Sequence, residues 1–373
     1  MFRRLYRRVY SDENLTEAWH KVRVRSNSDT AGVDGVTISQ FQRYLFSNLK
    51  TLQRDLRRRR YRPQPVKRIY ISKPDGSKRP LGILTVRDRI VQRAVLNVIE
   101  PLFEADFVET SYGFRPGRSV EMALEQVARL AEQGHEWVVD LDIEDFFESI
   151  NLKKLYALIA KKVKDRELRR IIRSWLEAET VTVQRNGLLK REEARGLLQG
   201  GVISPLLANV YLDRFDKLAH GKGLKVVRYA DDILILCRTE RQARRALKLA
   251  RKLLAKLDLK LNPHKTQIVH LERGLSFLGE TLLLEPGARG HRRLMRLVEQ
   301  AEAEIDQLQE QESREQQKEQ EIAIDGEREG RLAGPEPTLV PILPSDRETE
   351  GEERIRRDGH PLHHRAGRYP DEG

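Results

Sequence analysis

Cysteine is nearly absent from this chain of 373 residues, in which Cys237 is the single example. One cysteine excludes an intrachain disulfide and a zinc site built from several cysteines. Long apolar runs are also missing, because no stretch approaches the roughly 18 residues that a membrane-spanning helix needs. The first residues, MFRRLYRRVY, are basic and lack the apolar core of a secretory signal. These absences predict a cytoplasmic protein with no membrane partner.

Charge, in contrast, is abundant and unevenly distributed, with a formal net value of +12. Residues 301–330 carry eleven acidic and three basic side chains, and residues 331–373 carry nine and seven, which leaves +22 for residues 1–300. A folded region this basic usually meets a polyanion, and nucleic acid is the leading candidate. The alternative is a basic surface that only keeps the protein in solution.

The length predicts two or three structural units, and 39% hydrophobic residues are enough for a core. Residues 1–65 form a basic, mainly helical N-terminal extension, for whose four arginines at 57–60 phosphate contact and simple solvation are both open. Residues 331–373 contain six prolines and few core-forming residues, so we expect a disordered tail. Between them, hydrophobic periodicity predicts strands at 66–72, 79–82, 136–143, 226–227, 233–236, 259–261 and 267–271, and helices at 85–103, 152–178, 204–218 and 240–257.

Carboxylates stand out at two strand ends. Asp142 closes the apolar run 136–143, and Asp231 and Asp232 lie in a tight hairpin between two apolar strands. Carboxylates beside buried strands need compensation, and Mg²⁺ prefers oxygen ligands. Two such ions can activate a 3′-hydroxyl and stabilise departing pyrophosphate. An Asp-Asp pair at a turn is usually turn chemistry alone, but the string Tyr-Ala-Asp-Asp, 89 residues after a strand-end aspartate, favours the catalytic interpretation.

Nine sequence blocks, in order, are similar to the reverse transcriptases of group II introns and their bacterial relatives, with a CRISPR-associated branch among these. The resemblance covers roughly residues 30–285. The blocks are residues 31–35, 78–83, 88–92, 111–118, 140–150, 199–209, 228–232, 264–266 and 277–279.

The resemblance implies an α+β fold: a right-hand polymerase palm and fingers with a reduced or absent thumb and a disordered C-terminal tail. Fingers and palm would occupy residues 66–285. Intron-encoded relatives continue into a basic thumb and maturase domain, whereas this chain has a short basic stretch at 288–298 and then acidic residues. Residues 286–330 are therefore expected to be a thumb remnant or a charged helix.

The resemblance also assigns the catalytic centre. Asp142, Asp231 and Asp232 would hold two Mg²⁺ ions, with Mn²⁺ as a substitute, and the backbone carbonyl of Ile143 would join them. Lys265 resembles a lysine that protonates pyrophosphate; the alternative is an ordinary exposed lysine.

Five further residues resemble the nucleotide site. Lys73 and Arg79 would hold the triphosphate, with two solvated hairpin charges as the alternative. Phe147 resembles the steric gate that excludes a ribose 2′-hydroxyl, with core packing as the alternative. Gln199 and Gly200 belong to a loop whose glycines let backbone approach the incoming nucleotide closely.

Two arginines, Arg115 and Arg118, would contact template or primer phosphate, with a solvated loop as the alternative.

The predicted function is RNA-directed DNA polymerisation from dNTPs, with an RNA template and a DNA primer as partners. CRISPR spacer acquisition or another antiviral defence would add a CRISPR integrase complex as a partner. The alternative is a group II intron-encoded maturase, an RNA-binding protein for splicing and retrohoming.

Overall fold

The computed structural model describes residues 5–25, 30–72, 76, 78–183, 189–193, 195–286 and 292–298, which belong to the unit Met1–Ala303. The predicted disordered tail at 331–373 lies outside the described residues. Within the described ranges, no helix combines the length and the apolar character needed to cross a bilayer.

A four-stranded antiparallel sheet forms the palm. Its strand order is β6 (Lys225–Tyr229), β7 (Asp232–Cys237), β3 (Trp137–Leu141) and β8 (Gln267–His270). Successive side chains along each strand point to opposite faces of the sheet. Each face is buried against a different set of elements. The predicted strands at 136–143, 226–227, 233–236 and 267–271 are confirmed, whereas at 259–261 only Leu261 pairs, in an isolated bridge with Ile143.

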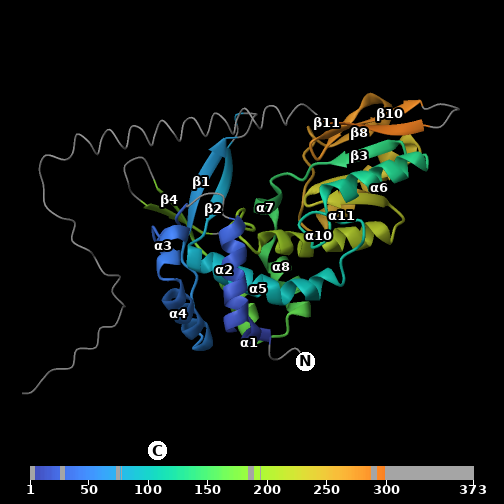
Figure 1. The fold of residues 1–373 in the computed structure, drawn as a ribbon. Coiled ribbons are helices and arrows are strands. Elements are labelled where there is room, and N and C mark those ends of the chain that lie inside the picture. The colour runs from blue at the N-terminus through green and yellow to red at the C-terminus, as the bar shows by residue number, and fades with distance from the viewer. Residues whose placement is uncertain are drawn as a thin grey trace, which may run out of the picture. The chain divides into compact units, whose positions relative to one another are not determined.

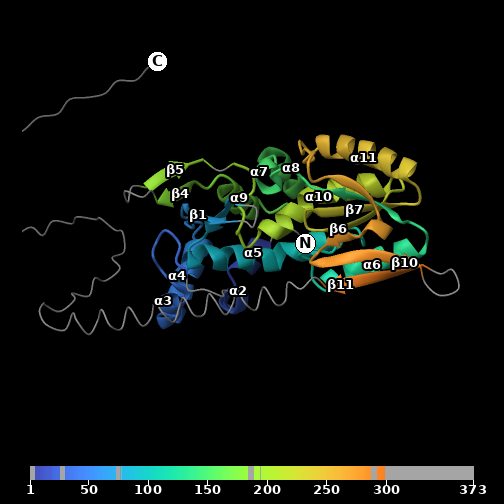
Figure 2. The ribbon, with the colours of Figure 1, turned by 90° about the horizontal axis from the view of Figure 1, so that it is seen from above.

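Helices α10 (Ser204–His220) and α11 (Glu240–Ala255) cover one face of the palm sheet, and α6 (Val120–Glu132) covers the other with a small sheet (Figure 2). That sheet consists of β9 (Leu275–Phe277), β10 (Glu280–Pro286) and β11 (Arg292–Val298) and follows the 3₁₀ turn η2 (Leu271–Arg273). Because β11 pairs with β10 in antiparallel register, residues 292–298 are a strand, which corrects the charged-helix alternative for this part of segment 286–330. Most of the remaining segment lies outside the described residues.

The fingers are organised around a second sheet, of order β2-β1-β4-β5. The predicted hairpin is confirmed as β1 (Val66–Ser72) paired with β2 (Lys78–Ile83). Strands β4 (Thr180–Val183) and β5 (Leu189–Glu192) were not predicted; β4 runs parallel to β1. The N-terminal residues form α1 (Leu5–Val9), α2 (Asp12–Arg25), α3 (Ile38–Arg43) and α4 (Leu45–Arg57), so the prediction of a mainly helical start is confirmed (Figure 1).

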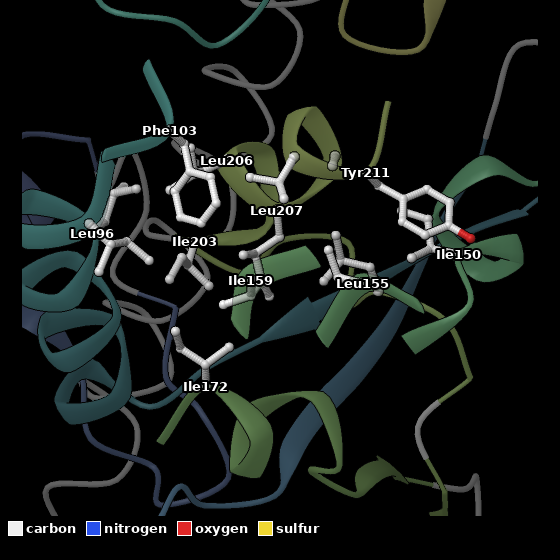
Figure 3. Packing of buried hydrophobic residues seen from close by; sticks show 14 of the residues in the cluster. Leu96, Phe103, Ile150, Leu155, Ile159, Ile172, Ile203, Leu206, Leu207 and Tyr211 are labelled. Atoms are coloured by element: carbon white, nitrogen blue, oxygen red, sulfur yellow. The ribbon is translucent and has the colours of Figure 1, made fainter. Parts of the chain in front are cut away.

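A buried helix, α5 (Val86–Glu104), lies between fingers and palm (Figure 1), and α2 packs against it. After the one-turn helix α7 (Phe146–Ser149), the single helix predicted at 152–178 is two helices, α8 (Leu152–Lys162) and α9 (Arg166–Leu176). Asp165 causes the break, since its side chain accepts the backbone N–H groups of Glu167 and Leu168 and caps α9. Figure 3 shows Leu155 and Ile159 of α8 packed toward Ile203 and Leu207 at the start of α10.

Candidate active site

Strand pairing brings the three predicted aspartates to one end of the palm sheet. The last pair of β6 and β7 is Tyr229 with Asp232, which leaves Ala230 and Asp231 as a two-residue loop. Strand β3 pairs with β7 through Leu141 and Ile233. Continuing that antiparallel register by one residue sets Asp142 opposite Asp232. The hairpin and the strand end therefore converge as the sequence predicts.

A fourth carboxylate, Asp140, lies two residues before Asp142 and faces the same side of the sheet. The side-chain amide of Gln267 donates to Asp140 Oδ2 at 3.2 Å. Burial raises the pKa of Asp140, and the nearby charge of Asp142 raises it further. No role was predicted for Asp140, although its spacing of two residues from Asp142 places both carboxylates on one side of a strand.

Burial, with repulsion added to it, disfavours the ionised aspartates at this end of the sheet. Desolvation, followed by the charges of the neighbouring aspartates, raises the pKa of Asp232 to about 6. Desolvation also raises the pKa of Asp231, while the positive charge of Arg79 lowers both values. The Asp232 side chain is nevertheless exposed at the strand end, so water screens part of the repulsion. A bound cation would stabilise the ionised form of carboxylates that lie this close together.

The donor set fits a magnesium site that substrate completes. No group of three His, Cys, Asp or Glu side chains forms a ready-made cage among the described residues. Mg²⁺ usually takes one or two carboxylates and fills its other positions with water and substrate phosphate. Around the bridge of Ile143 with Leu261, the two backbone bonds use the Asp142 carbonyl, which accepts from Asn262, and the Glu144 amide. The Ile143 carbonyl takes no part in these two bonds, which fits its predicted role.

Lys265 lies beside the aspartates, with its Nζ 3.9 Å from Asp142 Oδ2 and its side chain 58% exposed. The next residue, Thr266, accepts the Asp142 amide through its hydroxyl at 3.3 Å. This segment therefore fixes the Asp142 backbone and holds an exposed ammonium group at the edge of the site.

A cleft of about 660 Å³ separates the fingers hairpin from α10, and Phe147 and Gln199 both line it. The Phe147 ring is half-buried and packs edge-on against Phe146, with 5.3 Å between ring centroids. The Gln199 carbonyl accepts the Gly82 amide at 2.8 Å. Gly200 has φ +98°, and a Cβ there would lie 2.6 Å from the Gly82 carbonyl oxygen, so the predicted need for glycine has a steric cause.

Of the two residues predicted to hold triphosphate, the structure describes one. Arg79 is exposed on β2, and its charge acts on both Asp231 and Asp232. Lys73 lies outside the described residues.

The two arginines predicted to contact phosphate also lie in different environments. The Arg115 side chain is only 3% exposed and pairs with Glu104 at 2.6 Å. Its Nη1 donates to the carbonyls of Val108 and Ser111 at 2.6 and 2.7 Å. This placement argues against a phosphate contact, because the guanidinium is directed at the chain's own acceptors. Arg118 pairs with Glu109 near the surface and remains a candidate.

Residues 71–282 match the model of the family described as reverse transcriptase (RNA-dependent DNA polymerase). The chain belongs to this family. Protein YkfC of Escherichia coli K12 is 34% identical over 339 residues, which cover 80% of this chain and 88% of that protein.

The group II intron-encoded protein LtrA of Lactococcus lactis subsp. cremoris is 35% identical over 222 residues, or 58% of this reverse transcriptase and 35% of LtrA. Among solved structures, a partial Cas6-RT-Cas1--Cas2 complex is 27% identical, with a TM-score of 0.40, over 66% of this chain and 41% of that one.

Family membership confirms the predicted resemblance, the α+β reverse transcriptase fold and the predicted enzyme class, RNA-directed DNA polymerase. The family's chemistry is divalent-metal catalysis, and its substrates imply a nucleic-acid template and primer.

Proposed function

We propose that this reverse transcriptase extends a DNA primer 3′-hydroxyl with dNTPs on an RNA template, with Asp142, Asp231 and Asp232 as ligands of two Mg²⁺ ions. The observation that carries this proposal is the convergence of these carboxylates at the ends of β3 and β7, where desolvation and then the neighbouring aspartate charges raise the pKa of Asp232. When bound, the ions activate the 3′-hydroxyl and stabilise the leaving pyrophosphate.

The surrounding residues orient the nucleotide. Arg79 offers the triphosphate a cation on the fingers side, and we assign Lys73 the same role. Phe147 excludes a ribose 2′-hydroxyl by the bulk of its ring. Gln199 and Gly200 present backbone at close range, since Gly200 carries no Cβ.

Three further roles complete the proposed site. The Ile143 carbonyl adds a neutral oxygen ligand, and Lys265 donates a proton to the departing pyrophosphate. Arg118 neutralises template or primer phosphate.

Primer extension on poly(rA)/oligo(dT) with Mg²⁺ tests the proposal. We expect Asp142→Asn and Asp232→Asn to lose DNA synthesis by roughly 10³-fold or more, because each mutation removes several kcal/mol of charge stabilisation. RNA binding should survive, since the basic surface holds the template. Asp258→Asn is the matched control, because Asp258 pairs with Lys154 at 2.8 Å, outside the proposed site. Near-normal extension by either site variant would refute the assignment.

For the biological setting we keep CRISPR spacer acquisition or another antiviral defence as the hypothesis, with an integrase complex as partner. Intron splicing and retrohoming is the alternative. Both rest on the sequence resemblance. Neighbouring genes test them: an integrase gene and CRISPR arrays support the first, and intron RNA domains around the reading frame support the second.

A further inference from the structure

A fully buried arginine lies directly beneath the catalytic hairpin. Arg228 belongs to β6, and its side chain has no exposed surface. It pairs with Asp216 of α10, which is 2% exposed; Nη2 is 2.5 Å and Nε is 2.9 Å from the carboxylate oxygens. An isolated buried charge would be very unfavourable, so this pair must be complete to persist.

The other donors of Arg228 connect three parts of the chain. Nη2 donates to the Ser111 hydroxyl at 2.6 Å. Nη1 donates to Asn209 Oδ1 at 2.8 Å and to the Ala230 carbonyl at 2.7 Å. All five N–H groups of a guanidinium thus have an acceptor here. One of these acceptors is the backbone of the hairpin loop itself.

Ala230 occupies a conformation that alanine disfavours. Its φ is +56°, and a two-residue hairpin loop with positive φ at its first position normally has glycine there. Such a residue persists only where its surroundings enforce the conformation. Its immediate neighbour in the loop is Asp231, so the Ala230 peptide sets the direction in which that carboxylate points from the loop.

Gly113 packs against the same loop residue. A Cβ at Gly113 would lie 2.3 Å from the Ala230 backbone nitrogen. The Gly113 carbonyl accepts from Asn209 Nδ2 at 2.8 Å, and the Tyr112 amide donates to the Arg228 carbonyl at 2.8 Å. Arg228, through the Ala230 carbonyl, and Gly113, at the Ala230 nitrogen, therefore hold the Ala230 backbone.

We propose that Arg228 is a positioning residue: its guanidinium, held by Asp216, Asn209 and Ser111, fixes the Ala230 peptide and so aims Asp231 toward Asp142. Gly113 completes the same clamp by close packing. Arg228 itself touches neither substrate nor metal. This role rests on the proposed function of Asp231 as a catalytic ligand.

Two kinds of variant distinguish aiming from simple stabilisation. Arg228→Lys keeps the charge but loses the planar fork of donors. Gly113→Ala leaves the Arg228 network chemically intact and displaces Ala230 directly. Ser111→Ala is a milder variant that removes one acceptor, for use if Arg228→Lys fails to fold. Arg87→Lys is the control, because Arg87 pairs with Asp55 at 2.6 Å in the fingers.

We expect Arg228→Lys and Gly113→Ala to lower kcat by about 10- to 100-fold, as small misplacements of catalytic groups do. KM for dTTP should change less than kcat, because Arg79 and Lys73 also hold the triphosphate, and RNA affinity should stay within about twofold, because it does not depend on the direction of Asp231. Iron(II)-generated radical cleavage of the backbone near the hairpin, measured without substrate, should fall in parallel. Ser111→Ala should lower kcat less, and Arg87→Lys should change neither kcat nor cleavage.

Wild-type kcat and cleavage in folded Gly113→Ala and in folded Arg228→Lys or Ser111→Ala would overturn the positioning role. A fall in thermal stability with unchanged kcat and cleavage would also overturn it, since the contacts of Arg228 and Gly113 would then be purely structural. Asp231→Asn run in parallel separates the two proposals. If Asp231→Asn itself retains synthesis, the proposed function fails; if it is inactive while the clamp variants are normal, only the positioning role fails.

Discussion

Asp232 is the residue at which folding and the proposed metal binding make opposite demands. Its pKa in the folded, metal-free protein is about 6, above the ordinary value of 3.8. A raised carboxyl pKa contributes stability that is fully present below about 3.8 and is lost as the pH rises through about 6. At neutral pH the metal-free fold therefore carries an unfavourable charge that a bound cation would offset.

We predict that Asp232→Asn raises the melting temperature of the metal-free protein at pH 7.5, although it removes activity. At pH 5 the difference should shrink, because the wild-type carboxyl is then largely protonated. Thermal unfolding in EDTA at the two pH values measures this. Asp258→Asn should instead lower the melting temperature at pH 7.5, since a hydrogen bond from Lys154 lowers the pKa of Asp258. A lower melting temperature for Asp232→Asn at pH 7.5 would contradict the electrostatic account.

The Phe147 ring has two candidate roles, exclusion of a 2′-hydroxyl and packing in the core. We predict that Phe147→Val admits ribonucleotides, because a smaller side chain at the cleft leaves room for a 2′-hydroxyl. The measurement is the ratio of dGTP to GTP incorporation by the variant and the wild type on the same template. Phe147 contacts Phe146 and is half-buried, so stability must be checked as well. An unchanged ratio in a folded variant would assign the ring to core packing alone.

Sequence alone predicted the proposed ligands but not the residue that we propose to position one of them. Asp142, Asp231 and Asp232 were predictable because strand ends and a hairpin can be read from apolar periodicity. The role of Arg228 was not, because its partners Asp216 and Ser111 are 12 and 117 residues away. Nothing in a one-dimensional pattern tells that a basic residue in an apolar strand is buried by two distant elements.

Among the elements, long periodic helices and the two hairpins were predictable, and short strands were not. Strand β4 has four residues, and its parallel pairing to β1 joins residues more than 100 apart along the chain. The helix break at Asp165 depends on a capping bond that local propensity only weakly favours over continuation. Strand β11 lies where a thumb remnant or a charged helix was expected, and its antiparallel pairing with β10 is a contact that charge alone does not predict.

The segment before α6 is held in place by the buried side chain of Arg115. Arg115 ties residues 108 and 111 to Glu104 at the end of α5. We predict that Arg115→Ala destabilises the fold by about 3 kcal/mol, as expected when one partner of a buried ion pair is removed. Template affinity of the folded fraction should change little. Denaturant unfolding and filter binding measure the two effects.

Arg118→Ala is the matched comparison on the same segment, since Arg118 is near the surface. It should change stability little and reduce the salt dependence of RNA binding. If Arg115→Ala instead weakened binding without loss of stability, the predicted phosphate contact would be restored.

At the scale of the whole molecule, charge is segregated along the chain. The unit Met1–Ala303 and the following Glu304–Gly373 differ in sign. Residues 304–373 carry 19 acidic and 10 basic side chains, so the net charge of +12 corresponds to +21 on residues 1–303. Because phosphate neutralisation dominates affinity for nucleic acid, the tethered negative charge should oppose binding.

We predict that a chain ending at residue 303 binds single-stranded RNA more tightly, by roughly three- to tenfold at about 50 mM salt, and that the gain disappears at high salt as screening increases. Fluorescence anisotropy with a labelled oligonucleotide over a salt series measures this. A full-length variant with the eight glutamates of residues 304–330 replaced by glutamine separates charge from length. If charge is the cause, this variant should recover most of the gain; if only the shortened chain binds more tightly, the segment acts by occupying space. Equal affinity of all three proteins at low salt would mean that the segregated charge does not reach the template surface.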